Sequence, residues 1–492
     1  MSKKLVSFLS ALVTLCLLAS CGQAGTSEKP DGTQDAAAVS EQTTEAETEF
    51  SEDMLFTIEQ EDNGGKTFTI LSTETHAYEF NAEEENGEAV NDAVYDRNRA
   101  VEELLGVDLN FVYEDGVYEK RDAYYNLVYK SVAAGLNDYD IVTGMISCMV
   151  PFAASGIYTN FYDIPNIGLE NPWYATEFMD QMTIAGKMFC YAGDSSLSLY
   201  NYLSVIFANL DMLNAAGTAS PYSLVRDGKW TLDTLTEIAT SFGGDLNGDG
   251  EMKTEDDSWG LLFVGIRAVA LQCAFDIHFT ERENDSLVIR PLNERIVSAV
   301  ERTEALFQSP TVYGKSVNDY SPFLNAFLGN RCCFFLSQMM DTESLRDMKE
   351  DYAILPLPKL DEEQDDYRTL IPTATQIMFV PILSDLPLTG KVIETMNYYS
   401  WKWTVPAYYD TTLSIKYSRD ADTQEMLQII RRGLTLPVDY AYSGIMTGIN
   451  RILFDTAEKN QSSQLASNFE SKLNTWNGAL EKIVEEYENS GS

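Results

Sequence analysis

Strand and helix patterns alternate along the first part of the folded chain, and this alternation limits the folds that it can adopt. Three segments, Thr67–Leu71, Val107–Phe111 and Asp140–Thr143, have the pattern of strands. Helical patterns at Asn91–Leu105 and Tyr118–Ala134 separate them. Strands that alternate with helices form parallel βαβ units. The sequence therefore predicts an α/β lobe built on a mostly parallel sheet.

The ligand crevice of such a sheet lies beyond the carboxyl ends of its strands. In this chain, Ser72–Tyr78 and Thr143–Ser147 lie at the ends of two predicted strands. Both segments are therefore expected to line a crevice. His76 lies in the first of them and could hydrogen-bond a ligand, the alternative being an ordinary histidine in a surface loop.

The chain is longer than one hydrophobic core usually serves. The sequence has 492 residues, and 472 remain when the first 20 are set aside as an export signal. Single cores stop growing beyond about 250–300 residues, so two lobes are expected. Further amphipathic helices are predicted after the first lobe, among them Leu232–Phe242, with Thr231 as its cap, and Leu465–Tyr487.

The N-terminus has the features of a bacterial export signal. Lys3 and Lys4 precede the apolar run Leu5–Leu18, which is shorter than the roughly 20 residues that span a membrane. The following Cys21, after Leu-Ala-Ser, resembles the acylated cysteine of a bacterial lipobox. This resemblance implies a signal peptide over residues 1–20 and attachment to the extracellular face of the cell membrane through lipid on Cys21 only. A plain secretory signal with a chance cysteine is the alternative.

Residues 21–62 are expected to hold the lipid anchor and an acidic tether. Gly22–Glu49 contains one valine and no aromatic residue. A segment of this composition cannot bury enough apolar surface to fold, so the tether is predicted to be disordered.

Charge and motifs exclude several classes of function. The chain has 34 basic and 76 acidic residues, which gives a net charge of −42. Such a field repels phosphate groups and anionic lipids, so no nucleic-acid partner is expected. The two histidines, His76 and His278, are too few for histidine-based triads, and no hydrolase or P-loop motif is present. No catalytic residue is predicted, and the chain is not expected to be an enzyme.

Several short segments occur in an order that is typical of one family. They are Tyr139–Val142, Ala154–Gly156, Gly186–Phe189, Val205–Asn209, Lys229–Leu235, Asp257–Leu261, Phe327–Phe334 and Tyr352–Pro358. Together they resemble the extracellular solute-binding proteins of ABC importers, most closely family 1, which includes maltose- and oligosaccharide-binding proteins. Cys332-Cys333 departs from this family, which usually has Ala-Met in that apolar strand.

The resemblance implies a two-lobed, periplasmic-binding-protein-like α/β fold with mostly parallel central sheets and an interlobe hinge. It implies a monomer that captures an extracellular carbohydrate, an oligosaccharide, and delivers it to an ABC permease. A peptide or a polyamine stays open as the ligand of the same fold. A surface glycosidase or a glycan-adhesion lipoprotein is the rival from another class.

The same resemblance divides the chain into lobes. The expected parts are lobe 1 (63–198), lobe 2 (199–351), a return to lobe 1 (352–400), and a C-terminal helical region that completes lobe 2 and the hinge (401–492).

Six residues are candidates for contact with the ligand: Tyr78, Met145, Tyr200, Asn201, Gln338 and Trp401. The resemblance implies that Tyr200 and Asn201 lie near the first crossing between the lobes. It also implies that Met145 and Gln338 lie in loops that face the cleft. Aromatic rings offer flat faces to sugar C–H groups, and amides offer a donor and an acceptor to hydroxyls. Packing in the cores is the alternative for the aromatic residues.

Oxygen-bearing side chains recur at the spacing of a calcium loop near the middle of the chain. The expected ligands are Asp245, Asn247, Asp249, Glu251 and Asp256. Gly250 permits the sharp turn of such a loop, whereas Asp256 replaces the usual bidentate glutamate. The sequence predicts a structural Ca²⁺ and no other cofactor, with a polar turn that holds no metal as the alternative.

Overall fold

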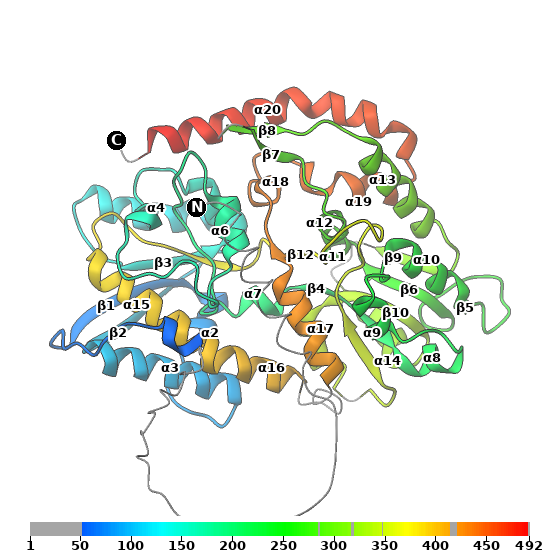
Figure 1. Cartoon of the computed structure of the whole chain (residues 1–492), viewed down its shortest axis with the longest axis horizontal. Coiled ribbons are helices and arrows are strands. Elements are labelled where there is room, and N and C mark those ends of the chain that lie inside the picture. Colours follow the sequence, from blue (N-terminus) through cyan, green and yellow to red (C-terminus); the bar gives the residue numbers. More distant parts are fainter. Residues whose placement is uncertain (1–51, 284–285, 316–318, 347, 414–420, 491–492) are drawn as a thin grey trace, which may run out of the picture. The chain divides into compact units, whose positions relative to one another are not determined.

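The computed structural model (Figure 1) describes residues 52–283, 286–315, 319–346, 348–413 and 421–490. The predicted signal peptide, Cys21 and the tether up to residue 51 lie outside these ranges, so those predictions stay predictions. Among the described helices, none combines the length and the apolar character needed to cross a membrane.

The first sheet has the strand order β13–β3–β1–β2. Its strands are β1 (Lys66–Thr73), β2 (Val107–Glu114), β3 (Ile141–Met145) and β13 (Gln376–Phe379). β1 pairs in parallel with β2 and β3, and β13 runs antiparallel to β3. The helices between these strands are α3 (Ala89–Leu105) and α4 (Arg121–Ala133). The predicted parallel βαβ units are confirmed.

Gly106 ends α3 and leads the chain directly into β2. Its φ is +58°, in the left-handed region. A Cβ atom at this position would lie 2.7 Å from the backbone nitrogen of Asn63. Glycine is therefore required by the conformation and by the close approach of the neighbouring chain. The turn lets α3 pack on β2, with Val94 and Val101 buried.

The second sheet has the strand order β11–β4–β10–β6–β5, and β9 also pairs with β6. Its strands are β4 (Ser204–Asn209), β5 (Gly243–Gly244), β6 (Ser258–Val264), β9 (Val312–Lys315), β10 (Cys332–Gln338) and β11 (Tyr352–Leu355). β10 runs parallel to β6 and antiparallel to β4. Cys332 and Cys333 are free and buried, so they serve as small apolar residues of a central strand.

Helix α10 (Leu232–Ser241) covers β6 of the second sheet. The hydroxyl of Thr231 accepts a hydrogen bond from the backbone N–H of Thr234 at 3.3 Å, so the predicted cap is confirmed. The packing is close, because a Cβ atom on Gly260 would lie 1.7 Å from the carbonyl oxygen of Ala239.

Strand β11 corrects one predicted lobe boundary. It pairs antiparallel with β4 and is therefore part of the second sheet, whereas residues 352–400 were predicted as the return to lobe 1. The physical reason is that the buried run Ala353–Leu355 completes the apolar second sheet. The chain re-enters the first sheet only at β13.

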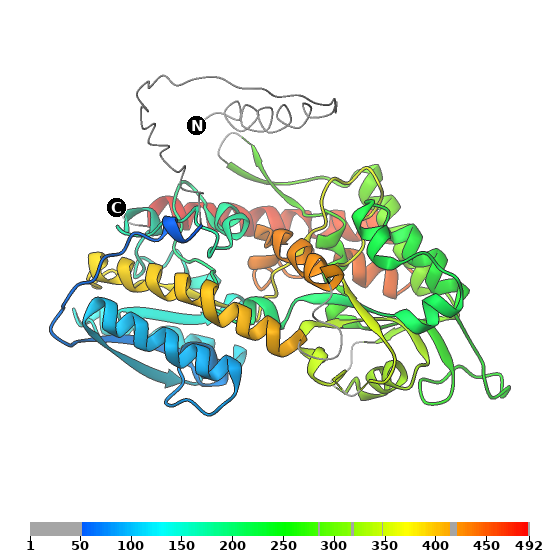
Figure 2. The same ribbon diagram turned by 60° about the horizontal axis from the view of Figure 1, so that its bottom comes forward.

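The helices after β13 correct a second boundary. α15 (Leu386–Tyr399) continues through a π-helical turn, Ser400–Thr404, into α16 (Val405–Leu413). α15 and α16 pack on α3, and Figure 2 shows them as one long rod beside it. Residues 401–413 therefore pack mainly on lobe 1, although they were predicted to help complete lobe 2 and the hinge, and α16 also contacts the turn Met339–Glu343 of lobe 2. α17 (Ala421–Arg432) packs on β11 of the second lobe.

The remaining elements are short, apart from α13 and the predicted C-terminal helix α20. They are α2 (Ala77–Phe80), α5 (Ile146–Met149), α6 (Thr176–Met182), α7 (Ser198–Asn201), α8 (Leu210–Ala215), α9 (Pro221–Arg226), α11 (Gly265–Ala268), α12 (Ala270–Ala274), α13 (Glu294–Phe307), α14 (Ser321–Leu328), α18 (Val438–Ala441), α19 (Ile452–Glu458), α20 (Leu465–Asn489), β7 (Thr280–Glu283), β8 (Ser286–Ile289), β12 (Thr369–Leu370) and β14 (Leu434–Thr435).

Candidate ligand-binding site

The chain first crosses from one sheet to the other through α7, which leads into β4 (Figure 1). Ser198 connects this crossing to lobe 1 through two hydrogen bonds. Its backbone N–H and its hydroxyl donate to Oε2 of Glu79 at 2.9 and 2.8 Å. Gln376, at the start of β13, donates its backbone N–H to the same hydroxyl at 2.9 Å. Glu79 is fully buried, and this burial raises its pKa to about 8.

The carboxyl ends of strands from both lobes meet beside this crossing. Tyr78, which follows β1, accepts a hydrogen bond from the amide of Asn201 at 3.1 Å. The next residue, Tyr202, lies with its hydroxyl 3.5 Å from Nε2 of His76. Gln338, at the end of β10, donates its amide to the carbonyl oxygen of Tyr202 at 3.0 Å. Hydrogen bonds thus join two of the predicted residues, Tyr78 and Gln338, to neighbouring residues of the crossing, Asn201 and Tyr202, so the structure brings Tyr78, Asn201 and Gln338 together at this point.

His76 lies beside Tyr202 of this crossing and is 5% exposed, so the surface-loop alternative is wrong. Its Nδ1 atom lies 2.9 Å from the hydroxyl of Thr75 and 3.3 Å from that of Thr73. Burial lowers the pKa of His76 to about 4, so the ring is neutral at neutral pH. Because both nitrogens lie beside hydroxyl groups of the protein, the neutral imidazole links the segment after β1 to Tyr202 of the crossing.

The wall of lobe 2 contains a polar cluster that was not predicted from the sequence. Arg267 follows β6, and its Nη1 lies 2.5 Å from Oδ2 of Asp341, which follows β10. The guanidinium carbon of Arg267 lies 4.1 Å from the ring centroid of Tyr320, whose hydroxyl donates to Asp341 at 2.7 Å. Both residues stand shortly after an apolar strand, but the sequence does not show that these two strands, β6 and β10, are neighbours in one sheet.

Met145 lies at the carboxyl end of β3, as expected from its place in the sequence. It is half-buried and pairs with Gln376 on β13, next to the anchor of the crossing. It therefore lies on the lobe 1 side of the crossing, and among the described residues no hydrogen bond joins its side chain to the other predicted residues.

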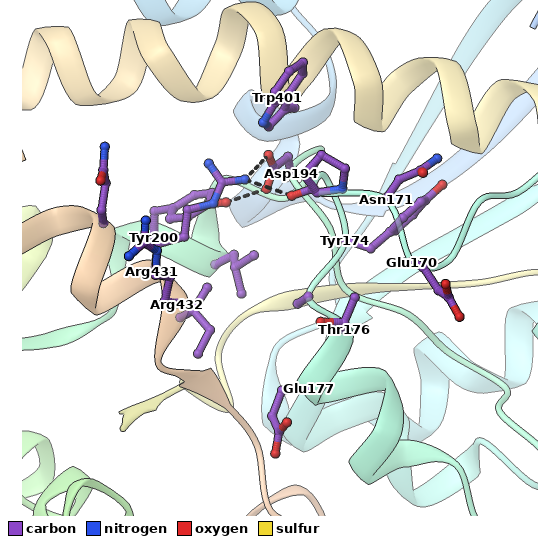
Figure 3. Close-up of a pocket in the computed structure, with 15 residues that line it drawn as sticks. Glu170, Asn171, Tyr174, Thr176, Glu177, Asp194, Tyr200, Trp401, Arg431 and Arg432 are labelled. Atoms are coloured by element: carbon purple, nitrogen blue, oxygen red, sulfur yellow. Dashed lines mark hydrogen bonds and ion pairs between the residues drawn. The ribbon is translucent and has the colours of Figure 1, made fainter. Parts of the chain in front are cut away.

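Tyr200 and Trp401, the other two predicted residues, line a different cavity of about 550 Å³ (Figure 3). Tyr200 is 1% exposed and donates its hydroxyl to Asp194. Arg431 binds the same carboxylate through Nη2 at 2.7 Å. Tyr200 and Asn201 are neighbours on α7 but point in different directions, because successive helical residues are rotated by about 100°.

The acidic loop after β5 is held together by its own backbone and by a lysine. The carboxylate of Asp245 accepts from two glycine amides of the loop, at 2.6 and 2.8 Å. The ammonium group of Lys253 lies 3.1 Å from Asp249 and 2.7 Å from Glu251. Asp257, which is buried, accepts from two further backbone amides at 2.9 and 2.7 Å.

The predicted calcium ligands are therefore already engaged in part. Asn247 and Asp256 are exposed. Within the ranges that the structure describes, no group of three or more His, Cys, Asp and Glu side chains is arranged to hold a metal ion. The calcium site thus stays a prediction, and an ion at this loop would have to displace the ammonium of Lys253.

Removal of calcium tests that prediction directly. If the loop binds the ion, excess Ca²⁺ at about a hundredfold over Kd stabilises the native state by about 2.7 kcal/mol. The melting temperature should then fall when a chelator is added, and the Asp245→Ala/Asp249→Ala variant should show no such difference. An unchanged melting curve, with no calcium found by elemental analysis, would contradict the prediction.

Comparisons with known proteins give a match in structure alone. No protein-family model and no curated protein sequence matches this chain. A solute-binding protein from Staphylococcus aureus in complex with maltose has a TM-score of 0.56 at 11% identity, covering 84% of this chain and 98% of that chain. The galacto-N-biose/lacto-N-biose I-binding protein of an ABC transporter from Bifidobacterium longum has a TM-score of 0.55 at 13% identity, covering 86% and 99%.

A cyclo/maltodextrin-binding protein complexed with maltotetraose is also similar, with a TM-score of 0.52 at 13% identity, covering 88% of this chain and 100% of that chain. These likenesses show the fold. The described residues form the two-lobed α/β fold of extracellular solute-binding proteins, so the predicted fold class is confirmed, but the second sheet is mixed rather than mostly parallel, since β4 and β5 pair antiparallel with their neighbours.

Proposed function

We propose that this protein captures an extracellular oligosaccharide in the crevice between its lobes and delivers it to an ABC permease. The observation that carries the proposal is that Tyr202 contacts both lobes. Its hydroxyl lies near His76, which follows β1 of lobe 1, and its carbonyl oxygen accepts from Gln338 at the end of β10 of lobe 2. The three solved structures of the same fold are described with lacto-N-biose, maltose or maltotetraose bound. Ligands of such folds are enclosed by hinge closure of the lobes.

The side chains of the crevice fit a sugar. Tyr78 is 47% exposed and presents an aromatic face, while Asn201 and Gln338 supply amide donors and acceptors. On lobe 2, Ile266 and Met340 follow β6 and β10 and are 61% and 42% exposed, so they would offer apolar surface to C–H groups of a ligand at these strand ends. The crevice therefore combines apolar faces with uncharged hydrogen-bonding groups, as a neutral carbohydrate requires.

A variant of Asn201 tests the binding role. One oligosaccharide of a glycan panel should raise the melting temperature of the wild type and bind without being cleaved. Asn201→Ala should weaken that binding about ten- to a hundredfold, since a lost polar contact corresponds to about 1.4–2.8 kcal/mol. Isothermal titration calorimetry measures the change. Asn214→Ala, an exposed substitution of the same kind on α8, should bind like the wild type.

The alternatives are distinguished by the glycan panel together with an uptake assay. Cleavage of a glycan would support a surface glycosidase, and glycan binding without any permease dependence of uptake would support an adhesion protein. A shift produced only by a peptide or a polyamine would keep the fold and exclude the sugar.

The proposal includes attachment of the protein to the extracellular face of the membrane through lipid on Cys21. The sequence Leu-Ala-Ser-Cys and the acidic tether behind it support this attachment. Two or more acyl chains on one residue anchor a protein durably, whereas one chain binds reversibly. Cys21→Ala should therefore move the protein from the membrane fraction to the soluble fraction of lysed cells. Equal partitioning of variant and wild type would contradict the anchor.

A further inference from the structure

The cavity that Tyr200 and Trp401 line is separate from the proposed crevice. None of Tyr78, His76 and Gln338 contributes to its lining. Its walls come from the loop around Glu170–Glu177 on one side and from the last turn of α17 on the other (Figure 3). A volume of about 550 Å³ falls within the range of small-molecule sites, about 300–1,000 Å³.

One wall of the cavity carries two adjacent arginines, Arg431 and Arg432. Nη2 of Arg431 donates to the carboxylate of Asp194 at 2.7 Å and to the carbonyl oxygen of Pro172 at 3.2 Å. Its Nε and Nη1 groups make no hydrogen bond to any described residue, and Arg432 forms no ion pair with one. Asp194 thus holds one guanidinium in place while its other donors stay available.

The opposite wall offers acceptors and an aromatic ring. Glu170, Thr176 and Glu177 line it with exposed side chains, and the two carboxylates have no ion-pair partner among the described residues. Trp401 closes one end of the cavity, with its ring centroid 5.7 Å from that of Trp173. Figure 3 shows the arginines on one side of the cavity and the two glutamates on other elements, with the guanidinium of Arg431 pointing toward Asp194 and the carboxylates of Glu170 and Glu177 turned away from the arginines.

We propose that this cavity is a second binding site, for a small ligand that carries a carboxylate together with hydrogen-bond donors. The carboxylate pairs with the free donors of Arg431 and with Arg432, since a guanidinium matches a carboxylate in shape and charge. The hydroxyl or ammonium groups of the ligand donate to the hydroxyl of Thr176, and its apolar face lies against Trp401. A uronic acid and a free amino acid share this chemistry.

Calorimetric titration of the whole protein separates these sources. The probes are galacturonate and glutamate. Galactose is the control for galacturonate because it lacks the carboxylate, and glutamine is the control for glutamate because it lacks only the side-chain carboxylate. We expect the uronate or the amino acid to bind, and galactose not to bind at this site. If galacturonate alone binds, the site recognises an acidic sugar; if glutamate and glutamine both bind, it recognises the α-carboxylate of an amino acid.

Arg432→Gln should weaken this binding about tenfold or more, as the loss of a charge-assisted pair predicts. Arg99→Gln removes the same charge from α3, far along the chain from the cavity, and should leave binding unchanged. Asn201→Ala, which affects the crevice, should leave it unchanged as well, so failure of this site and failure of the proposed function are distinguishable. Absence of binding by every carboxylate at millimolar concentration, or equal binding by Arg432→Gln and wild type, would overturn the proposal and leave both arginines as charges that stabilise the end of α17.

Discussion

The wild-type protein is expected to lose stability as the pH rises from 4.5 to 8, because the buried Glu79 ionises. Replacement of Glu79 with glutamine is expected to abolish most of this loss. Burial raises the pKa of Glu79 from 4.5 to about 8, while the hydrogen bonds from Ser198 and the charge of Arg97 oppose this shift. The native state therefore keeps a proton that the unfolded chain releases above pH 4.5. The contribution of Glu79 is complete below pH 4.5 and is lost as the pH rises through 8.

The expected size of the effect is on the order of 4 kcal/mol over this interval, from the shift in pKa. The difference in unfolding free energy between Glu79→Gln and wild type, measured by urea denaturation at several pH values, should grow in favour of the variant up to pH 8. Glu301→Gln, an exposed substitution on α13, should give a constant difference. Parallel pH profiles for Glu79→Gln and wild type would show that the buried carboxyl does not titrate in this range.

The first lobe could be predicted from the sequence because its signals are local. A strand of alternating or apolar residues, a helix of periodic residues and a glycine at the turn each lie within one short segment. The predictions of Thr67–Leu71, Asn91–Leu105 and Val107–Phe111, which lie within the observed elements β1, α3 and β2, needed no knowledge of distant contacts. The parallel order of the strands then followed from general rules of connection. β11 was assigned to the wrong lobe because an apolar strand does not show which sheet it will join.

The candidate site could be predicted only in part, for a different reason. Tyr78, Asn201 and Gln338 were found because each stands at a strand end or at a crossing. The direction of Tyr200 could not be read from α7, which has four residues and shows no periodicity. The pairing of Arg267 with Asp341 joins residues that are 74 positions apart. Neither pattern nor spacing in the sequence indicates such a contact, which the packing of β6 beside β10 creates.

Replacement of Arg431 with glutamine is expected to lower the free energy of unfolding by about 3 kcal/mol, because it removes the charged partner of a buried carboxylate. Asp194 is 2% exposed, and its remaining side-chain bond comes from the hydroxyl of Tyr200. Burial already raises the pKa of Asp194, and Arg431 opposes that rise.

The Asp194→Asn/Arg431→Gln double variant should recover much of the loss, since it leaves no uncompensated charge in the interior. Arg99→Gln is the matched control, because the ion pair of Arg99 with Glu102 is largely exposed on the arginine side and contributes less than about 1 kcal/mol. Urea denaturation of the wild type, Asp194→Asn, Arg431→Gln and the double variant gives the coupling energy between Asp194 and Arg431. If Arg431→Gln lowers the free energy of unfolding no more than Arg99→Gln does, the carboxylate of Asp194 is stabilised without the guanidinium. Tyr200 and the surrounding packing alone would then hold this wall of the cavity in place.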